Sequence, residues 1–205
     1  MAESAQIVTF LFTQDLRGDL RFLPKLARVL MQLRLVEQRT LTLDLGGMCS
    51  PEVWHCAVTD GRSMLIALDG LNYAAVNAEG VPDSVWPSLT KSLVYMQAVD
   101  SIHTGKMGHV RFVTRQPAEE IPPEILALVI APHAEASIVG NTVYFPAVES
   151  HKVARMRVKT AAPAEIVSLE VFEVPPDTAP DPTISGMVEF IENEARQYGK
   201  RREQK

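Results

Sequence analysis

The sequence predicts a two-layered α/β domain with a mixed β-sheet or a pair of sheets. Three observations lead to this prediction. Buried-strand patterns alternate with amphipathic helical patterns between residues 7 and 80. Polar and apolar residues then alternate in later segments that read as antiparallel strands, and a helical pattern closes the chain. Strand–helix alternation is typical of parallel sheets with helices on their faces.

The first strand is expected at residues 7–12, because "IVTFLF" is β-branched and aromatic and shows no polar alternation. An amphipathic helix follows, with Leu23, Leu26 and Leu30 on one side. Three further buried strands and one helix are expected along the chain. The strands are 40–47, 73–80 and 124–131, and the helix is 61–72.

The middle and the last part of the chain give further elements. The middle predicts a helix after Pro87 and a strand at 109–114. Gly140-Asn141 predicts the turn of a hairpin over 136–147. Two alternating strands and a helix capped by Asp181 complete the pattern. They are 152–160, 165–174 and 182–199. We therefore expect one domain over 1–199 and a basic, disordered tail over 200–205.

Composition restricts the class of protein. With 46% hydrophobic and 22% charged residues, the chain can build a sizeable core. Its net charge of -5 argues against binding to nucleic acid. The apolar runs are too short to cross a bilayer, and the start reads as no signal peptide. Cys49 and Cys56 form no disulfide framework and no C-x-x-C motif. We expect a cytoplasmic protein.

Polar residues follow the four buried strands of the first two thirds of the chain. They are Asp15 and Arg17, then Asp44, Gly46 and Gly47, then Asn77 and Glu79, then His133 and Glu135. Functional groups in α/β sheets collect at the carboxyl ends of strands. We therefore expect the strands ending at Phe12, Leu45, Val76 and Ala131 to share one sheet, with these residues at one edge.

The ordered motifs resemble the calcineurin-like metallophosphoesterases, and among them the 5′-nucleotidase branch. "TQDLRG" stands where the family has T-N-D-x-H-G, and "LDLGG" stands where it has L-D-A-G-D. "ALDGLNYAAVNAEG" resembles the third motif, and "PHAE" followed by "ASIVGNTVYFPA" resembles the last motif and its hairpin. The resemblance covers 7–80 and 124–174. It implies a layered fold with mixed β-sheets flanked by helices.

The resemblance also implies phosphate-ester hydrolysis by two metal ions about 4 Å apart, held by His and Asp ligands and a bridging carboxylate. This chain departs from that set. Arg17 replaces a ligand His, Gly47 replaces the bridging Asp, and Ala78 replaces the catalytic His. Glu135 replaces the second His of the last motif. The expected relic cleft comprises Asp15, Arg17, Gly47, Asn77, Ala78, Glu79, His133 and Glu135.

These departures predict a degenerate member that has lost two-metal hydrolysis and keeps a binding or regulatory role. No cofactor is expected. The partner would be a protein or a small-molecule anion, not nucleic acid or a membrane. One alternative is a divergent hydrolase with one weakly bound divalent metal ion on Asp15, Asn77, His133 and Glu135. Another is a structural subunit whose interface is 81–123. Arg17 is expected to pair with Asp15 or Glu135 in place of the lost metals.

Structural interpretations remain open beside these. Asp15 and Asn77 could be a turn residue and a strand cap, and His133 a half-buried histidine. The proximity of Cys49, His55 and Cys56 gives a minor possibility of a zinc site. A basic strand face is more often a solvated surface than a binding patch. That face comprises Arg155, Arg157 and Lys159.

Overall fold

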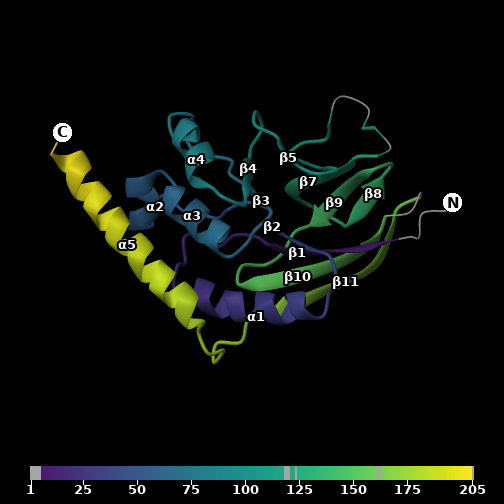
Figure 1. The fold of residues 1–205 in the computed structure, drawn as a ribbon, viewed down its shortest axis with the longest axis horizontal. Coiled ribbons are helices and arrows are strands. Elements are labelled where there is room, and N and C mark those ends of the chain that lie inside the picture. Colours follow the sequence, from purple (N-terminus) through teal and green to yellow (C-terminus); the bar gives the residue numbers. More distant parts are fainter. Residues whose placement is uncertain (1–5, 118–120, 123, 161–162, 205) are drawn as a thin grey trace.

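The computed structural model describes residues 6–117, 121–122, 124–160 and 163–204. Two mixed β-sheets face each other, and helices cover the outer face of the larger sheet (Figure 1). This confirms the predicted α/β class with mixed sheets flanked by helices. Among the described residues, none of the helices is long and apolar enough to span a membrane.

The larger sheet has the strand order β11-β10-β1-β2-β3-β4. β1 to β4 are parallel to one another, and β10 and β11 run antiparallel. Their bounds are β1 Ile7–Thr13, β2 Thr40–Asp44, β3 Ala75–Asn77, β4 Gln97–Val99, β10 Lys152–Lys159 and β11 Glu165–Glu173. The carboxyl ends of the parallel strands therefore meet at one edge, as the sequence predicts for the first three.

The smaller sheet has the order β5-β6-β7-β9-β8. Its bounds are β5 Gly105–Met107, β6 Val110–Val113, β7 Leu126–His133, β8 Ser137–Val139 and β9 Thr142–Pro146. β7 pairs with β6 and β9 in parallel. The prediction that the strand ending at Ala131 shares a sheet with the first three was therefore wrong. A buried apolar strand suits either sheet, and only its pairing partners decide between them.

Five helices are described, and each contributes buried side chains to the core on the outer face of the larger sheet. Their bounds are α1 Leu23–Leu35, α2 Trp54–Thr59, α3 Arg62–Gly70, α4 Trp86–Ser92 and α5 Pro182–Glu203. α5 crosses α1, α2 and α3 (Figure 1). It extends beyond its predicted end at Gly199, so the basic residues Lys200, Arg201 and Arg202 continue the helix. Arg202 donates a hydrogen bond to the Val58 carbonyl (2.9 Å), which holds this end against α2.

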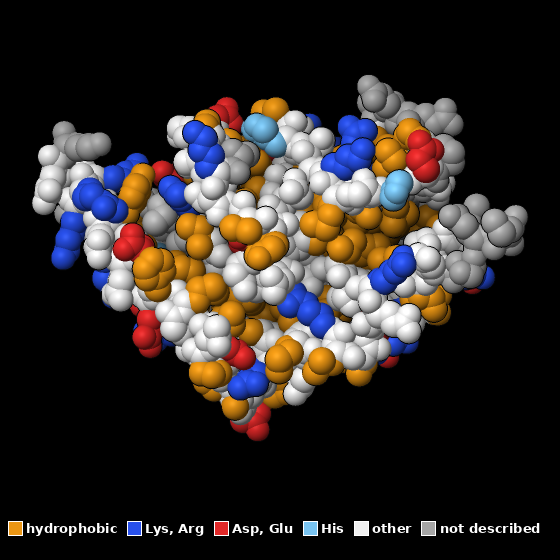
Figure 2. Space-filling model, viewed as in Figure 1, with side chains coloured by type: hydrophobic (Ala, Val, Ile, Leu, Met, Phe, Trp, Pro, Cys, Tyr) orange, Lys and Arg blue, Asp and Glu red, His pale blue; other side chains and the backbone are white. Residues whose placement is uncertain are grey.

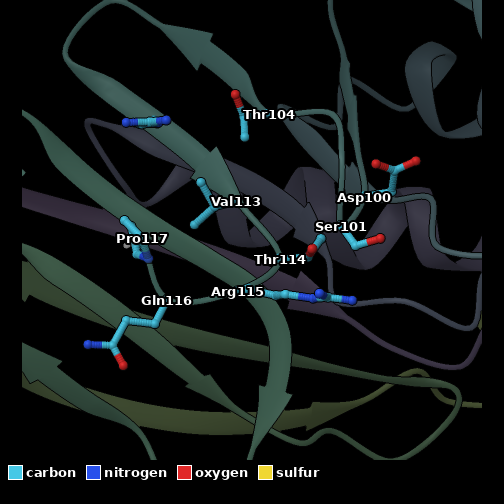
Figure 3. Close-up of a pocket in the computed structure, with 9 residues that line it drawn as sticks. Asp100, Ser101, Thr104, Val113, Thr114, Arg115, Gln116 and Pro117 are labelled. Carbon is cyan, nitrogen blue, oxygen red and sulfur yellow. The ribbon is translucent and has the colours of Figure 1, made fainter. Parts of the chain in front are cut away.

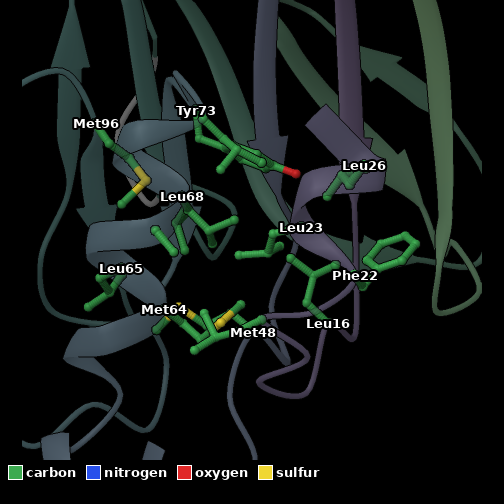
Figure 4. Close-up of a cluster of buried hydrophobic side chains, with 14 of the residues drawn as sticks. Leu16, Phe22, Leu23, Leu26, Met48, Met64, Leu65, Leu68, Tyr73 and Met96 are labelled. Atoms are coloured by element: carbon green, nitrogen blue, oxygen red, sulfur yellow. The ribbon is translucent and has the colours of Figure 1, made fainter. Parts of the chain in front are cut away.

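Each face of the larger sheet contacts a hydrophobic core. Between the sheets, the rings of Phe10 and Phe12 pack edge-on against Phe145, with centroids 5.4 and 5.1 Å apart. On the helix side, side chains of α1 and α3 interdigitate with those of the sheet and its loops (Figure 4). Edge-to-face contacts and close packing of this kind stabilise both layers.

The basic face of β10 lies beneath the end of α1. The guanidinium groups of Arg155 and Arg157 both contact the Glu37 carboxylate, whose side chain is 7% exposed. Burial raises the pKa of Glu37, but hydrogen bonds from Arg157 and Thr9 and the charges of both arginines outweigh it and lower the pKa. Arg155 and Arg157 therefore join β10 to the loop between α1 and β2 and are not a free surface patch.

Candidate functional site

The loop after β1 carries an ion pair at the carboxyl edge of the larger sheet. The Arg17 guanidinium donates to the Asp15 carboxylate at 2.7 Å. Asp15 and Arg17 both have left-handed backbone conformations, with φ of 61° and 51°. Their amide groups donate to the carbonyls of Gly46 and Gly47, which ties this loop to the one after β2. Asp15 also raises the pKa of the Arg17 guanidinium, through their hydrogen bond and its negative charge.

Gly47 lies directly against Asp15. A Cβ atom at position 47 would come within 2.5 Å of Asp15 Oδ1 and 3.1 Å of its Cα. The φ of Gly47 is also 71°, a value that disfavours other residues. A side chain at position 47 would therefore displace the Asp15 carboxylate.

The polar groups at the end of β3 bind neighbouring loops. Asn77 Nδ2 donates to the Leu45 carbonyl (3.1 Å), and Asn77 Oδ1 accepts from the Glu79 amide (3.0 Å). Glu79 in turn accepts from the amide and the hydroxyl of Ser101. Ala78 is fully buried between them. Both amide atoms of Asn77 thus have backbone partners, as in the strand-cap interpretation.

His133 and Glu135 lie at the end of β7, in the other sheet. The His133 ring packs edge-on against Tyr144, with centroids 4.9 Å apart. Its Nε2 is buried and has no hydrogen-bond partner among the described residues. Glu135 is exposed and forms no ion pair within the described part of the chain. Direct contacts therefore join Asp15, Arg17, Gly47, Asn77 and Glu79 through their loops, but they do not connect His133 or Glu135 to this group.

A buried carboxylate lies beneath this edge, and the sequence analysis placed it at a strand end without giving it a role. Asp44 accepts from the Thr13 hydroxyl (2.8 Å) and from the Gly46 amide (3.0 Å). Because the Thr13 proton is used there, the Tyr73 hydroxyl, 3.0 Å away, donates to Thr13. Burial raises the pKa of Asp44 to about 7 despite these hydrogen bonds. An aspartate between two leucines in a strand is the sequence signal for such a group.

A disulfide joins Cys49, in the loop after β2, to Cys56 in α2. The sequence did not predict this bond, because two cysteines seven residues apart show no framework pattern. The bond leaves no thiolates for zinc. His55 uses Nε2 on the Gly18 carbonyl and Nδ1 on the Ser63 hydroxyl, both at 2.8 Å. Disulfides are more typical of oxidising compartments, so the cytoplasmic location stays a prediction.

A cavity of about 500 Å³ adjoins this segment and the relic residues Gly47 and Glu79. Both cysteines line it. Across the described residues, no group of three or more His, Cys, Asp or Glu side chains is placed to hold a metal ion.

Comparison with solved structures identifies the fold. No protein-family model and no curated protein matches the sequence. The structure superimposes on the calcineurin-like phosphoesterase YfkN from Bacillus subtilis with a TM-score of 0.58, over 96% of this chain and 100% of that one, at 9% identity. The chain has the calcineurin-like phosphoesterase fold. At this identity the likeness concerns the fold alone.

Two longer proteins share this fold. The NAD nucleotidase NadN of Haemophilus influenzae gives a TM-score of 0.60 at 8% identity, over 95% of this chain and 61% of that one. A protein from Staphylococcus aureus that is named as a 5′-nucleotidase gives 0.54 at 11% identity, over 92% and 58%. The chain therefore spans about 60% of the length of these two, and the likeness to the 5′-nucleotidase branch is confirmed for the fold.

Proposed function

We propose that this chain is a calcineurin-like phosphoesterase-fold protein that has lost two-metal hydrolysis and retains a binding or regulatory role. The observation that carries the proposal is the contact between Gly47 and Asp15. Position 47 is where the family's bridging carboxylate would stand, and the space beside it holds the Asp15 carboxylate.

The residues present do not fit a pair of metal ions. Two dications at short separation repel each other unless an anion lies between them. Gly47 offers none, and the nearest carboxylate, Asp15, is paired with Arg17. The side-chain oxygen and nitrogen of Asn77 have backbone partners. His133 faces Tyr144. We derive no metal-dependent step for this chain.

In this proposal, the Arg17 guanidinium supplies the positive charge that the metal ions supply in the family. A guanidinium stays charged and offers a planar set of donors that suits carboxylates. It lies 2.7 Å from Asp15, where the family places a ligand histidine beside its metal. The ion pair thus balances the negative charge of the Asp15 carboxylate without a metal ion.

An activity assay tests the proposal. The purified protein is incubated with phosphomonoesters, phosphodiesters and nucleotides in the presence of Mn²⁺, and we expect no turnover above the buffer background. Loss of several members of a catalytic unit reduces rates by orders of magnitude. The alternative, a divergent single-metal hydrolase, predicts turnover that Asp15→Ala abolishes. Asp177→Ala is the matched control, because Asp177 is an exposed carboxylate far along the chain from this edge.

A further inference from the structure

A second pocket lies at the carboxyl ends of β4 and β6, on the open face of the smaller sheet (Figure 3). Its volume is about 260 Å³. None of the residues that line it belongs to the relic cleft. They are Asp100, Ser101, Thr104, Arg111, Val113, Thr114, Arg115, Gln116 and Pro117.

Two arginines of this pocket have no anionic partner among the residues that the structure describes. Arg111 and Arg115 form no ion pair or side-chain hydrogen bond with any other residue that the structure describes. Lys106 stands directly opposite Arg111 in the β5–β6 pair, so two cations face each other across the strands. Like charges in this position repel. In a chain with a net charge of -5, Lys106, Arg111 and Arg115 form no ion pair with any other described residue, and their charges create a local positive field.

Figure 2 shows Lys and Arg side chains over the region of β5 to β7, at the upper right, beside a hydrophobic area. The hydrophobic side chains of the outer face of the smaller sheet include Val113, Val129 and Tyr144. An apolar wall next to a cationic group lowers the local dielectric and strengthens the attraction for an anion.

Hydroxyl groups complete the lining. Thr114 Oγ1 is buried and has no hydrogen-bond partner among the described residues. Thr104 lies on the pocket wall, and Arg115 extends below Thr114 and Ser101 (Figure 3). The amide and hydroxyl of Ser101 already bind Glu79. The unused donors therefore come from Thr104, Thr114 and the two arginines.

One carboxylate also lines the pocket, and it opposes an anion. Asp100 accepts hydrogen bonds from the amides of Ile102 (2.7 Å) and His103 (2.6 Å) and contacts His103 Nδ1 at 3.1 Å. Burial raises its pKa, but these hydrogen bonds outweigh burial and lower the pKa. Asp100 thus stays charged, with its charge directed into its own loop, and the two arginines leave the pocket a net positive charge.

We propose that this pocket binds a tetrahedral oxyanion: inorganic phosphate, or a phosphoryl group carried by a small molecule. Arginine forks and hydroxyl donors are suited to phosphate oxygens. The volume of about 260 Å³ is large enough for a phosphoryl group and lies just below the range for drug-sized ligands, which starts near 300 Å³. The proposal does not depend on the loss of hydrolysis, because the two sites share no lining residue.

Calorimetric titration of the intact protein at low ionic strength tests the proposal, with inorganic phosphate in one arm and glycerol 3-phosphate in the other. We expect a Kd of about 1 mM or tighter for at least one of them. Arg111→Gln and Arg115→Gln should each weaken binding by about tenfold or more. The matched control is Arg21→Gln. Arg21 is exposed and does not line the pocket, so this substitution removes the same charge outside it. It should leave the affinity unchanged.

Amide chemical shifts in ¹⁵N-labelled protein locate the anion, and circular dichroism verifies that each variant is folded. Phosphate-dependent shifts at Ser101, Thr104 and Thr114 support the proposal. Binding of both ligands would show that the phosphoryl group suffices, whereas binding of the ester alone would identify a carried phosphate. The proposal is overturned if neither ligand binds, or if the two pocket variants bind as the control does.

Discussion

At the scale of single residues, the Arg17 guanidinium neutralises the charge of the Asp15 carboxylate. The Arg17 side chain is 69% exposed, and exposed ion pairs contribute little to stability because water screens them. Arg17→Ala should therefore change the free energy of unfolding only slightly. It should also leave Asp15 without a cation and raise the affinity for Mn²⁺, measured by calorimetric titration.

The matched control is Arg21→Ala, which removes an exposed arginine that forms no ion pair among the described residues and should not change Mn²⁺ affinity. Equal Mn²⁺ affinity in the wild type and in Arg17→Ala would mean that Arg17 does not act as the cation of the cleft. A stoichiometric ion beside Asp15 in the wild-type protein would contradict the proposal equally.

Asp44 should make stability depend on pH. Its pKa is about 7 in the folded protein against 3.8 in the unfolded chain, so the folded state binds more protons between these values. The free energy of unfolding should therefore fall as pH rises from about 4 to 7, by up to about 4 kcal/mol. Asp44→Asn keeps the side-chain shape and should remove this slope.

Chemical denaturation at several pH values gives the free energy of unfolding of the wild type and of Asp44→Asn. The slopes of these two pH profiles are then compared. Asp177→Asn serves as the control, because Asp177 is exposed, and it should retain the wild-type slope. Parallel pH profiles for the wild type and Asp44→Asn would rule out this role for Asp44.

At the scale of elements, the disulfide constrains the segment that joins β2 to α2. Cys49 and Cys56 are separated by seven residues, and closing a short loop in the unfolded chain contributes roughly 2–3 kcal/mol. Reduction should therefore lower the melting temperature by roughly 5–10 °C. Thermal denaturation with and without dithiothreitol measures this. The double variant Cys49→Ser/Cys56→Ser should melt at the lower temperature, and dithiothreitol should not change it further.

At the scale of the whole molecule, the larger sheet contributes to both hydrophobic cores. Phe10 and Phe12 of β1 face the second sheet, and Leu11 between them faces the helices. Loss of this strand would open both cores, so we expect one cooperative unfolding transition. Far-ultraviolet circular dichroism and tryptophan fluorescence should give coincident denaturation curves. Two separated midpoints would show that the layers unfold independently and would argue against the predicted single domain.

The spacing of apolar residues was enough to predict the elements that bury one continuous apolar face. β1, α1 and α3 lie where the apolar spacing predicts them. The three-residue strands β4 and β5 and the six-residue helix α2 were not predicted, because they are too short to show a period. The meeting of Asp15 with Gly47 was also predictable. Parallel strands place their carboxyl ends at one edge, whatever the details of packing.

The sequence by itself thus determined the fold class and the absence of a carboxylate at position 47 and of an imidazole at position 78. The tertiary structure alone decided the sheet of β7, the disulfide between Cys49 and Cys56, and the packing of His133 against Tyr144. It also brought Arg111 and Arg115 to one pocket and placed Lys106 opposite Arg111. The physical reason is that residue type and spacing fix local conformation, whereas partners distant along the chain are set by which buried faces pack together.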